Sequence, residues 1–146
     1  MSQGLILACA SCGQKNRIPA ARLEAEARCG RCHAAVRAPG AVSEVDDLDA
    51  LETALSTAEV PVLVDFWAPW CGPCRMVAPE VAKVAARHAG DLVVLKVNTD
   101  ADPRVGARYG IQSIPTMALF RGGREAARTS GARPASAIES WVAAAR

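Results

Sequence analysis

The chain lacks several features that would place it at a membrane or on a nucleic acid. No apolar stretch approaches the roughly 18–20 residues of a membrane span. The apolar run Leu5–Leu7 has no basic residue before it and is shorter than a signal-peptide core. The formal net charge is only +2 in 146 residues, with no long run of one sign. No Gly-rich dinucleotide motif occurs. We therefore expect no membrane, nucleic-acid, nucleotide or flavin partner.

Six cysteines stand out instead, because they form three C-x-x-C pairs. Without an export signal, such pairs favour a reducing, cytoplasmic setting with metal-binding and catalytic thiols. The segment Ile6–Cys9 also resembles a bacterial lipoprotein cleavage box, but it has no signal sequence to follow. Length and the apolar content of 51% suit a packed domain of about 100 residues plus a small module.

The first two pairs, Cys9/Cys12 and Cys29/Cys32, are separated by 16 residues, a spacing typical of zinc sites. Four thiolates fill a tetrahedral Zn²⁺ with no open position, as in structural sites. A second redox-active disulfide system is the main alternative. The stretch Cys29–His33 also matches a c-type haem attachment pattern, which the intact second pair disfavours. His33 is expected to face solvent beside the metal.

This N-terminal segment has few large apolar residues, and fewer than about 40 residues seldom fold without a metal or disulfides. Metal binding would therefore be coupled to folding. Residues Asn16–Pro19 are interpreted as turn chemistry, and Ala38-Pro39-Gly40 as a break in regular structure. The predicted division is a small zinc-ribbon-like module over 1–38, a linker over 39–42 and a second domain over 43–146.

Helices and buried strands alternate in the second domain, which predicts an α/β fold with a mixed sheet and helices on both faces. Val62–Trp67 is uniformly apolar apart from Asp65 and predicts a central strand covered on both sides. Two helices are expected around this strand: one capped by Asp46 or Asp47 and bearing Leu48, Leu51 and Leu55, and one over Pro73–His88 with Met76, Val77, Val81, Val84 and Ala85 in helical period. A strand over Leu92–Val97 and a helix over Pro103–Tyr109, stopped by Gly110, are expected next. The chain is then expected to form a hairpin of Thr116–Arg121 and Glu125–Ser130 and a last helix from Pro134.

The third pair, Cys71 and Cys74, follows the central strand where a helix should begin. Residues three apart on a helix share a face, close enough for a disulfide. The unpaired amides of a helix start favour negative charge, so the pKa of Cys71 should fall from about 8.5 toward roughly 3.5–7.5. Cys71 is thus the expected nucleophile. Cys74, one turn deeper and less exposed, is the expected resolving thiol.

The segment Asp65–Cys74, DFWAPWCGPC, resembles the active-site segment of thioredoxins. A lone C-x-x-C could also be half of a zinc site, but this longer motif after a buried strand favours redox chemistry. The resemblance implies a thioredoxin fold from about Ser43 to the end. With both N-terminal pairs included, the whole chain resembles the bacterial thioredoxin 2 branch, which carries a zinc module.

Asp65 is the anomaly in the central strand, because a buried carboxylate is costly when charged and its pKa should be raised. From the residues alone, it could instead be an aspartate near a strand end satisfied by backbone amides. The family resemblance implies that Asp65 accepts the proton of Cys74, directly or through a water molecule. It also implies that Lys96 pairs with Asp65, although a plain strand-end lysine is an equal reading.

The resemblance further implies that the Ile114–Pro115 bond is cis and faces the cysteines, although X-Pro bonds are mostly trans. Ile114 would then pair through its backbone with an extended client chain, and Pro115 could keep metals off the thiols. Gly131 is placed near this substrate groove, and Trp70 is expected in the docking surface, with a core position as the alternative. The pair Gly72-Pro73 is linked in the family to reducing members.

The predicted reaction is reduction of protein disulfides by dithiol exchange, in a monomer that carries one structural zinc. The family resemblance implies disulfide-containing client proteins and an NADPH-dependent thioredoxin reductase as partners. An oxidase or isomerase is the alternative within redox chemistry. A zinc-dependent client-binding or holdase module, with Leu5–Leu7 in contact with clients and the C-x-x-C as a redox sensor, is the alternative from another class. Oxidation of the zinc cysteines could also expel the metal under stress.

Overall fold

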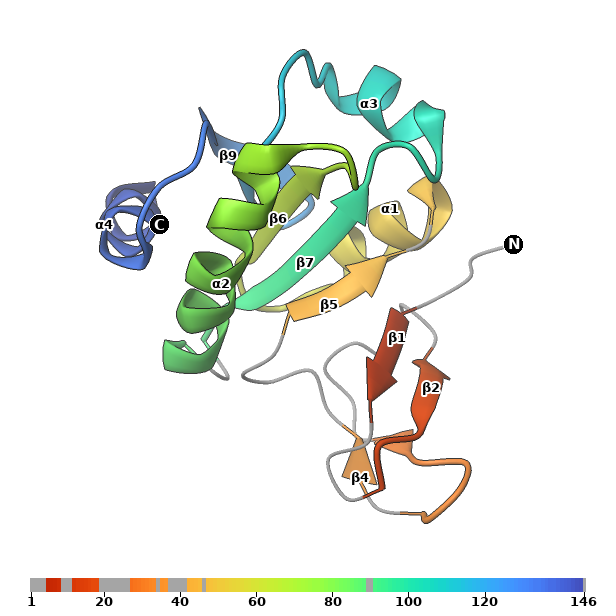
Figure 1. Cartoon of the computed structure of the whole chain (residues 1–146). Coiled ribbons are helices and arrows are strands. Elements are labelled where there is room, and N and C mark those ends of the chain that lie inside the picture. The colour runs from red at the N-terminus through yellow and green to blue at the C-terminus, as the bar shows by residue number, and fades with distance from the viewer. Residues whose placement is uncertain are drawn as a thin grey trace.

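The computed structural model describes residues 5–8, 12–18, 27–33, 35–36, 42–45, 47–88 and 91–145 (Figure 1). Within these ranges, no helix combines the length and the apolar character needed to cross a lipid bilayer. Several predicted features lie outside the described residues: Cys9, Pro19, Asp46 and residues 38–41. Of the predicted linker, only Val42 is described, and it is the first residue of a strand.

Seven strands form one sheet, and their order is β2-β1-β5-β7-β6-β8-β9. The two middle pairings, β5 with β7 and β7 with β6, are parallel, and β8 and β9 close the sheet as an antiparallel hairpin. The strands are β1 (Leu5–Ala8), β2 (Lys15–Ile18), β5 (Val42–Val45), β6 (Val62–Trp67), β7 (Val93–Asn98), β8 (Thr116–Arg121) and β9 (Arg124–Ser130).

Strand β6 lies between β7 and β8 and separates two hydrophobic clusters, as its apolar run predicted. Alternate residues of a strand point to opposite faces. Val64 and Phe66 accordingly belong to one cluster, whereas Leu63 belongs to the other. Burial on both faces explains why the run does not alternate with polar residues.

Four helices cover the two faces of the sheet (Figure 1). Helices α1 (Leu48–Thr57) and α3 (Pro103–Tyr109) contribute to the first cluster, and α2 (Gly72–Arg87) and α4 (Ala135–Ala145) to the second. Helix α1 begins where the Asp47 carboxylate accepts the Ala50 N–H at 2.8 Å, a standard N-cap. Helix α3 ends at Gly110, whose φ of 62° suits glycine. The predicted α/β fold with helices on both faces is confirmed.

Two details of the sequence interpretation are wrong. Lys15–Ile18, part of which was assigned to a turn, forms strand β2 and pairs with β1, because backbone pairing holds this polar segment in the sheet. Met76, included in the apolar face of α2, is 72% exposed. Its neighbour Val77 takes the buried position, so Met76 falls on the outer side of the helix.

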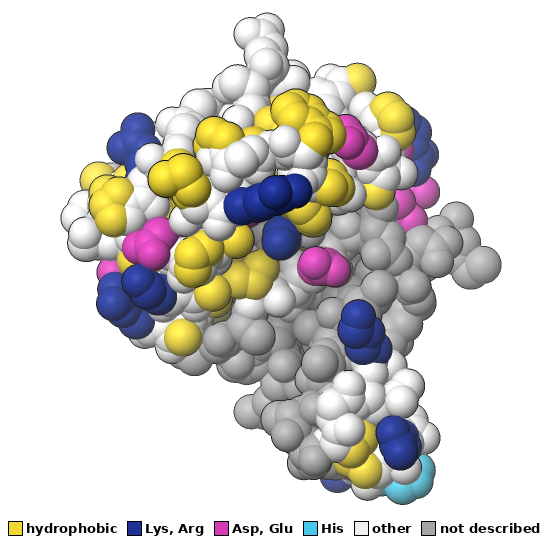
Figure 2. Space-filling view, viewed as in Figure 1, with side chains coloured by type: hydrophobic (Ala, Val, Ile, Leu, Met, Phe, Trp, Pro, Cys, Tyr) yellow, Lys and Arg dark blue, Asp and Glu magenta, His cyan; other side chains and the backbone are white. Residues whose placement is uncertain are grey.

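The N-terminal residues form a small body joined to the main sheet (Figure 1). Strand β1 pairs with β2 on one side and, antiparallel, with β5 on the other. Among the described residues, a second sheet pairs β3 (Ala27–Arg28) with β4 (Ala35–Val36). Figure 2 shows hydrophobic and basic side chains on the main body and also on the small body below it.

Candidate active site and metal centre

Cys71 and Cys74 lie at the start of α2 and form a disulfide, with Cα atoms 5.3 Å apart. Cys71 is the N-cap residue, and its sulfur accepts the backbone N–H of Cys74 at 3.2 Å. The first turn of a helix leaves such N–H groups without backbone partners and favours negative charge. The local geometry therefore stabilises a thiolate on Cys71 once the disulfide is reduced.

The two cysteines do not differ in exposure, since each residue is 4% exposed. The expectation that Cys74 is the less exposed of the pair is therefore wrong for this oxidised form. The disulfide holds the Cys71 sulfur against the helix end, 3.7 Å from the carbonyl oxygen of Ile114. Their chemical difference must come from the helix terminus and from neighbouring groups.

The Ile114–Pro115 peptide bond is cis and precedes β8. The Gly131 N–H donates to the Pro115 carbonyl at 2.9 Å, which places β9 beside the same loop. Gly131 has a φ of 91°, and a Cβ at this position would meet no atom within 4 Å. The space beside the Gly131 backbone is therefore open.

Trp70 is 69% exposed and stands directly before Cys71. Its indole N–H donates to the Asp100 carboxylate at 2.9 Å, which fixes the ring orientation. Sequence reasoning missed Asp100, because the two residues are 30 positions apart. A cavity of about 320 Å³ adjoins the ring and reaches Ser113 and Ile114.

Asp65 is 1% exposed and lies on the face of the sheet that α2 covers. Among the described side chains, its Oδ1 has no hydrogen-bond partner. Burial raises the pKa of Asp65 to about 6, and the positive charge of Lys96 partly opposes that rise. Lys96 is the register neighbour of Asp65 on β7. Its ammonium lies over the Trp67 ring, 4.1 Å from the centroid, a cation–π contact.

Replacement of Asp65 by Asn is expected to stabilise the oxidised protein at neutral and alkaline pH. A pKa raised from 3.8 to about 6 means that the folded state holds the proton more tightly than the unfolded chain. That contribution is complete below pH 3.8 and is lost as the pH rises through about 6. Asp65→Asn should therefore gain little at pH 4 and roughly 3 kcal/mol at pH 8 in urea unfolding. A pH-independent difference would contradict this account.

Three cysteines of the N-terminal pairs converge: the sulfur atoms of Cys12, Cys29 and Cys32 all lie within 4.8 Å of one another. The Cys12 and Cys29 sulfurs are 3.7 Å apart, close to the roughly 3.8 Å between ligands of a tetrahedral zinc with 2.3 Å bonds. Backbone N–H groups of Cys32 and then Arg31 lower the pKa of Cys29 to about 6. These donors fit a soft divalent cation such as zinc.

Two residues support this cluster from outside. The Asn16 side chain accepts the Gly30 N–H at 2.9 Å, which ties β2 to the Cys29–Cys32 turn. His33 is exposed, as predicted, and its backbone has a φ of 64°, a conformation in which histidine is enriched. Sequence reasoning did not identify Asn16 as a partner of this turn.

Comparisons with known proteins agree with both sites. Residues 42–144 match the family model described as Thioredoxin, and residues 8–34 match the one described as Thioredoxin 2, N-terminal.

The chain belongs to the thioredoxin family.

Curated thioredoxins are similar over most or part of the chain. Thioredoxin C-3 of Corynebacterium nephridii is 40% identical over 138 residues, which cover 94% of this chain and 93% of that protein. Thioredoxin 1 of Nostoc sp. is 54% identical over 81 residues, 56% and 76% of the two chains. Thioredoxin of Synechocystis sp. is 47% identical over 102 residues, 70% and 94% of the two. As a thioredoxin-family member with an intact redox pair, the chain is a protein-disulfide oxidoreductase.

Proposed function

We propose that this thioredoxin-family chain reduces protein disulfides, with Cys71 as nucleophile and Cys74 as resolving thiol. The Cys71 thiolate attacks one sulfur of a client disulfide, forms a mixed disulfide and releases the other client sulfur as a thiolate. Cys74 then loses its proton and attacks the Cys71 sulfur. The client leaves as a dithiol with two electrons gained, and the Cys71–Cys74 disulfide forms. The observation that supports this most is the disulfide at the N-terminus of α2.

Asp65 is proposed as the group that accepts the Cys74 proton, directly or through water. Its pKa of about 6 lies near neutral pH, where a general base works best. Lys96 modulates this base from the neighbouring strand. Its ammonium lies over the Trp67 ring, and we propose that it stays there while Asp65 accepts the proton.

Client recognition is proposed to occur along the open backbone beside the disulfide. Trp70, Gly72 and Pro73 form one rim of this groove, and Ile114, Pro115 and Gly131 form the other. An extended client segment can pair with the backbone of Ile114, as in strand addition. The exposed Trp70 ring and the cavity beside it offer apolar contact to a client without selecting for one client sequence.

The N-terminal thiols are proposed to hold one structural zinc, with Cys9 joining Cys12, Cys29 and Cys32. Bound zinc would supply a crosslink between the two C-x-x-C turns. No step of disulfide reduction needs it, because both redox sulfurs lie at α2. We propose that the chain divides into a zinc module over 1–38, a linker over 39–42 and a redox domain over 43–146.

The partners follow from the same chemistry. After each turnover the Cys71–Cys74 disulfide must be reduced, and an NADPH-dependent thioredoxin reductase is the proposed electron source. Clients are proteins with an accessible disulfide. We propose that the chain acts as a monomer in the cytoplasm.

Replacement of Cys74 by Ser is expected to stop the reaction at the mixed disulfide. Reduced Cys74→Ser protein mixed with oxidised insulin should accumulate a covalent complex on non-reducing gels, which dithiothreitol releases. Peptide mass analysis should locate the bond at Cys71. The matched control, Cys71→Ser/Cys74→Ser, should form no complex. A complex linked instead through Cys74 in the single variant Cys71→Ser, at a comparable rate, would reverse the assigned roles.

A further inference from the structure

Two carboxylates flank Lys96 across three adjacent strands. In the parallel pairing of β5 with β7, Glu44 is the register neighbour of Lys96. In the parallel pairing of β7 with β6, Lys96 is the register neighbour of Asp65. Register neighbours in a sheet project from the same face, about 4.8 Å apart. The row therefore reads carboxylate, ammonium, carboxylate, with Glu44 at its exposed end and Asp65 at its buried end.

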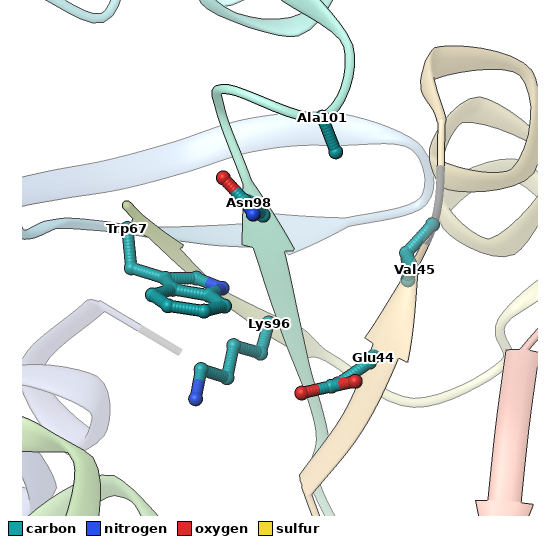
Figure 3. A pocket seen from close by; sticks show the side chains of 6 residues that line it. All are labelled: Glu44, Val45, Trp67, Lys96, Asn98 and Ala101. Atoms are coloured by element: carbon teal, nitrogen blue, oxygen red, sulfur yellow. The ribbon is translucent and has the colours of Figure 1, made fainter. Parts of the chain in front are cut away.

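Figure 3 shows the exposed end of this row. Glu44 extends from β5 across β7 toward Lys96, and the Lys96 chain passes beneath the Trp67 ring. These residues line a cavity of about 400 Å³. A second cavity of about 220 Å³ is bounded by Glu44, Lys96 and Asp65 together. One cavity thus connects the buried carboxylate with the exposed one.

No other charge reaches this row from the elements packed on it, among the described residues that line the two cavities. Helix α2 contributes Ala78, Val81 and Ala82. On β8, the register neighbour of Asp65 is Met117. Glu44 and Asp65 are therefore the two carboxylates beside Lys96 in this row, and the Lys96 ammonium itself rests over the Trp67 ring.

We propose that Glu44 is a positioning residue for the redox reaction: its carboxylate competes with Asp65 for the Lys96 charge across the row and leaves Asp65 only partly compensated. Asp65 then retains the proton affinity that it needs to accept the Cys74 proton. This inference rests on the proposed role of Asp65. Glu44 itself touches neither cysteine, so its action passes through Lys96.

Titration of Asp65 in the oxidised protein tests the proposal, because neither redox cysteine titrates in that form. Carbonyl-detected NMR should show the Asp65 pKa about half a unit or more lower in Glu44→Gln than in the wild type, since Lys96 then acts on Asp65 alone. In a Lys96→Met background, Glu44→Gln should shift it far less. Glu52→Gln, an equal change on α1 over the opposite face, should not shift it.

Two results would overturn the role of Glu44: an unchanged Asp65 pKa in Glu44→Gln, or an equal fall with and without Lys96. The second would mean simple repulsion between the two carboxylates. The pH dependence of mixed-disulfide resolution tests the role of Glu44 separately from the proposed role of Asp65 as the base. If Asp65→Asn resolves as fast as the wild type, Asp65 is not the base and both ideas fail. If Asp65→Asn is slow and Glu44→Gln has a wild-type titration, only the role of Glu44 fails.

Discussion

Cys71→Ser is expected to lose disulfide-reductase activity by on the order of 10³-fold or more, because a serine hydroxyl is not ionised at neutral pH and cannot replace a thiolate. Turnover of insulin with dithiothreitol as the electron source is the direct measurement. It avoids dependence on a particular reductase. The uncatalysed rate with dithiothreitol alone sets the floor of the assay.

The comparison needs a fold control, because the variant also loses the disulfide. Reduced wild-type protein is the matched reference, and its far-UV circular dichroism and urea midpoint should agree with those of Cys71→Ser. A variant that keeps more than about a tenth of wild-type turnover would contradict the assignment of Cys71. If Cys71→Ser lost turnover but still bound client proteins, that result would favour an additional holdase activity, the alternative considered from the sequence.

Cys29→Ser is expected to abolish stoichiometric zinc binding and to unfold the N-terminal module. Cys29 is fully buried and its sulfur accepts the Arg31 N–H, so this thiol is held inside the cluster. Structural zinc in small modules contributes on the order of 10 kcal/mol of binding free energy that is also folding free energy. Zinc content should fall from about one per chain to near zero, and amide protection over residues 12–18 and 27–33 should be lost.

His33→Ala is the control for this experiment, because His33 neighbours Cys32 but is exposed. It should keep its zinc. Both variants should keep insulin turnover within about twofold of wild type, since the redox pair lies at the start of α2 and makes no use of the N-terminal thiols. Retention of zinc by Cys29→Ser, or its loss in His33→Ala, would refute the proposed ligand set.

The elements that the sequence predicted best are those governed by local physics. Strand β6 was predicted from an unbroken apolar run, α3 from Pro103 and Gly110, and the β8–β9 hairpin from Gly122-Gly123. The cis bond before Pro115 came only from family resemblance, because local statistics favour trans. Family resemblance thus supplied what short-range preferences could not.

The missed features depend on contacts between segments distant in sequence. Strand β2 is polar and exists through its pairing with β1. The Glu44–Lys96–Asp65 row arises from the strand order β5-β7-β6, which no single segment encodes. The similar exposure of Cys71 and Cys74 in the disulfide depends on the surrounding loops, whereas the prediction considered only the position of each cysteine along the helix.

The pairing of β1 with β5 also protects the protein from unwanted self-association. Without β1, the short strand β5 would offer unpaired N–H and C=O groups to any passing chain, and such exposed edges promote aggregation. With the hairpin in place, the outermost strand is β2, whose sequence carries Lys15 and Arg17, and charged residues discourage further strand addition. The edge strand on the opposite side of the sheet, β9, also carries charged residues: Arg124, Glu125 and Arg128. The N-terminal hairpin therefore also limits aggregation at this edge of the domain that it precedes.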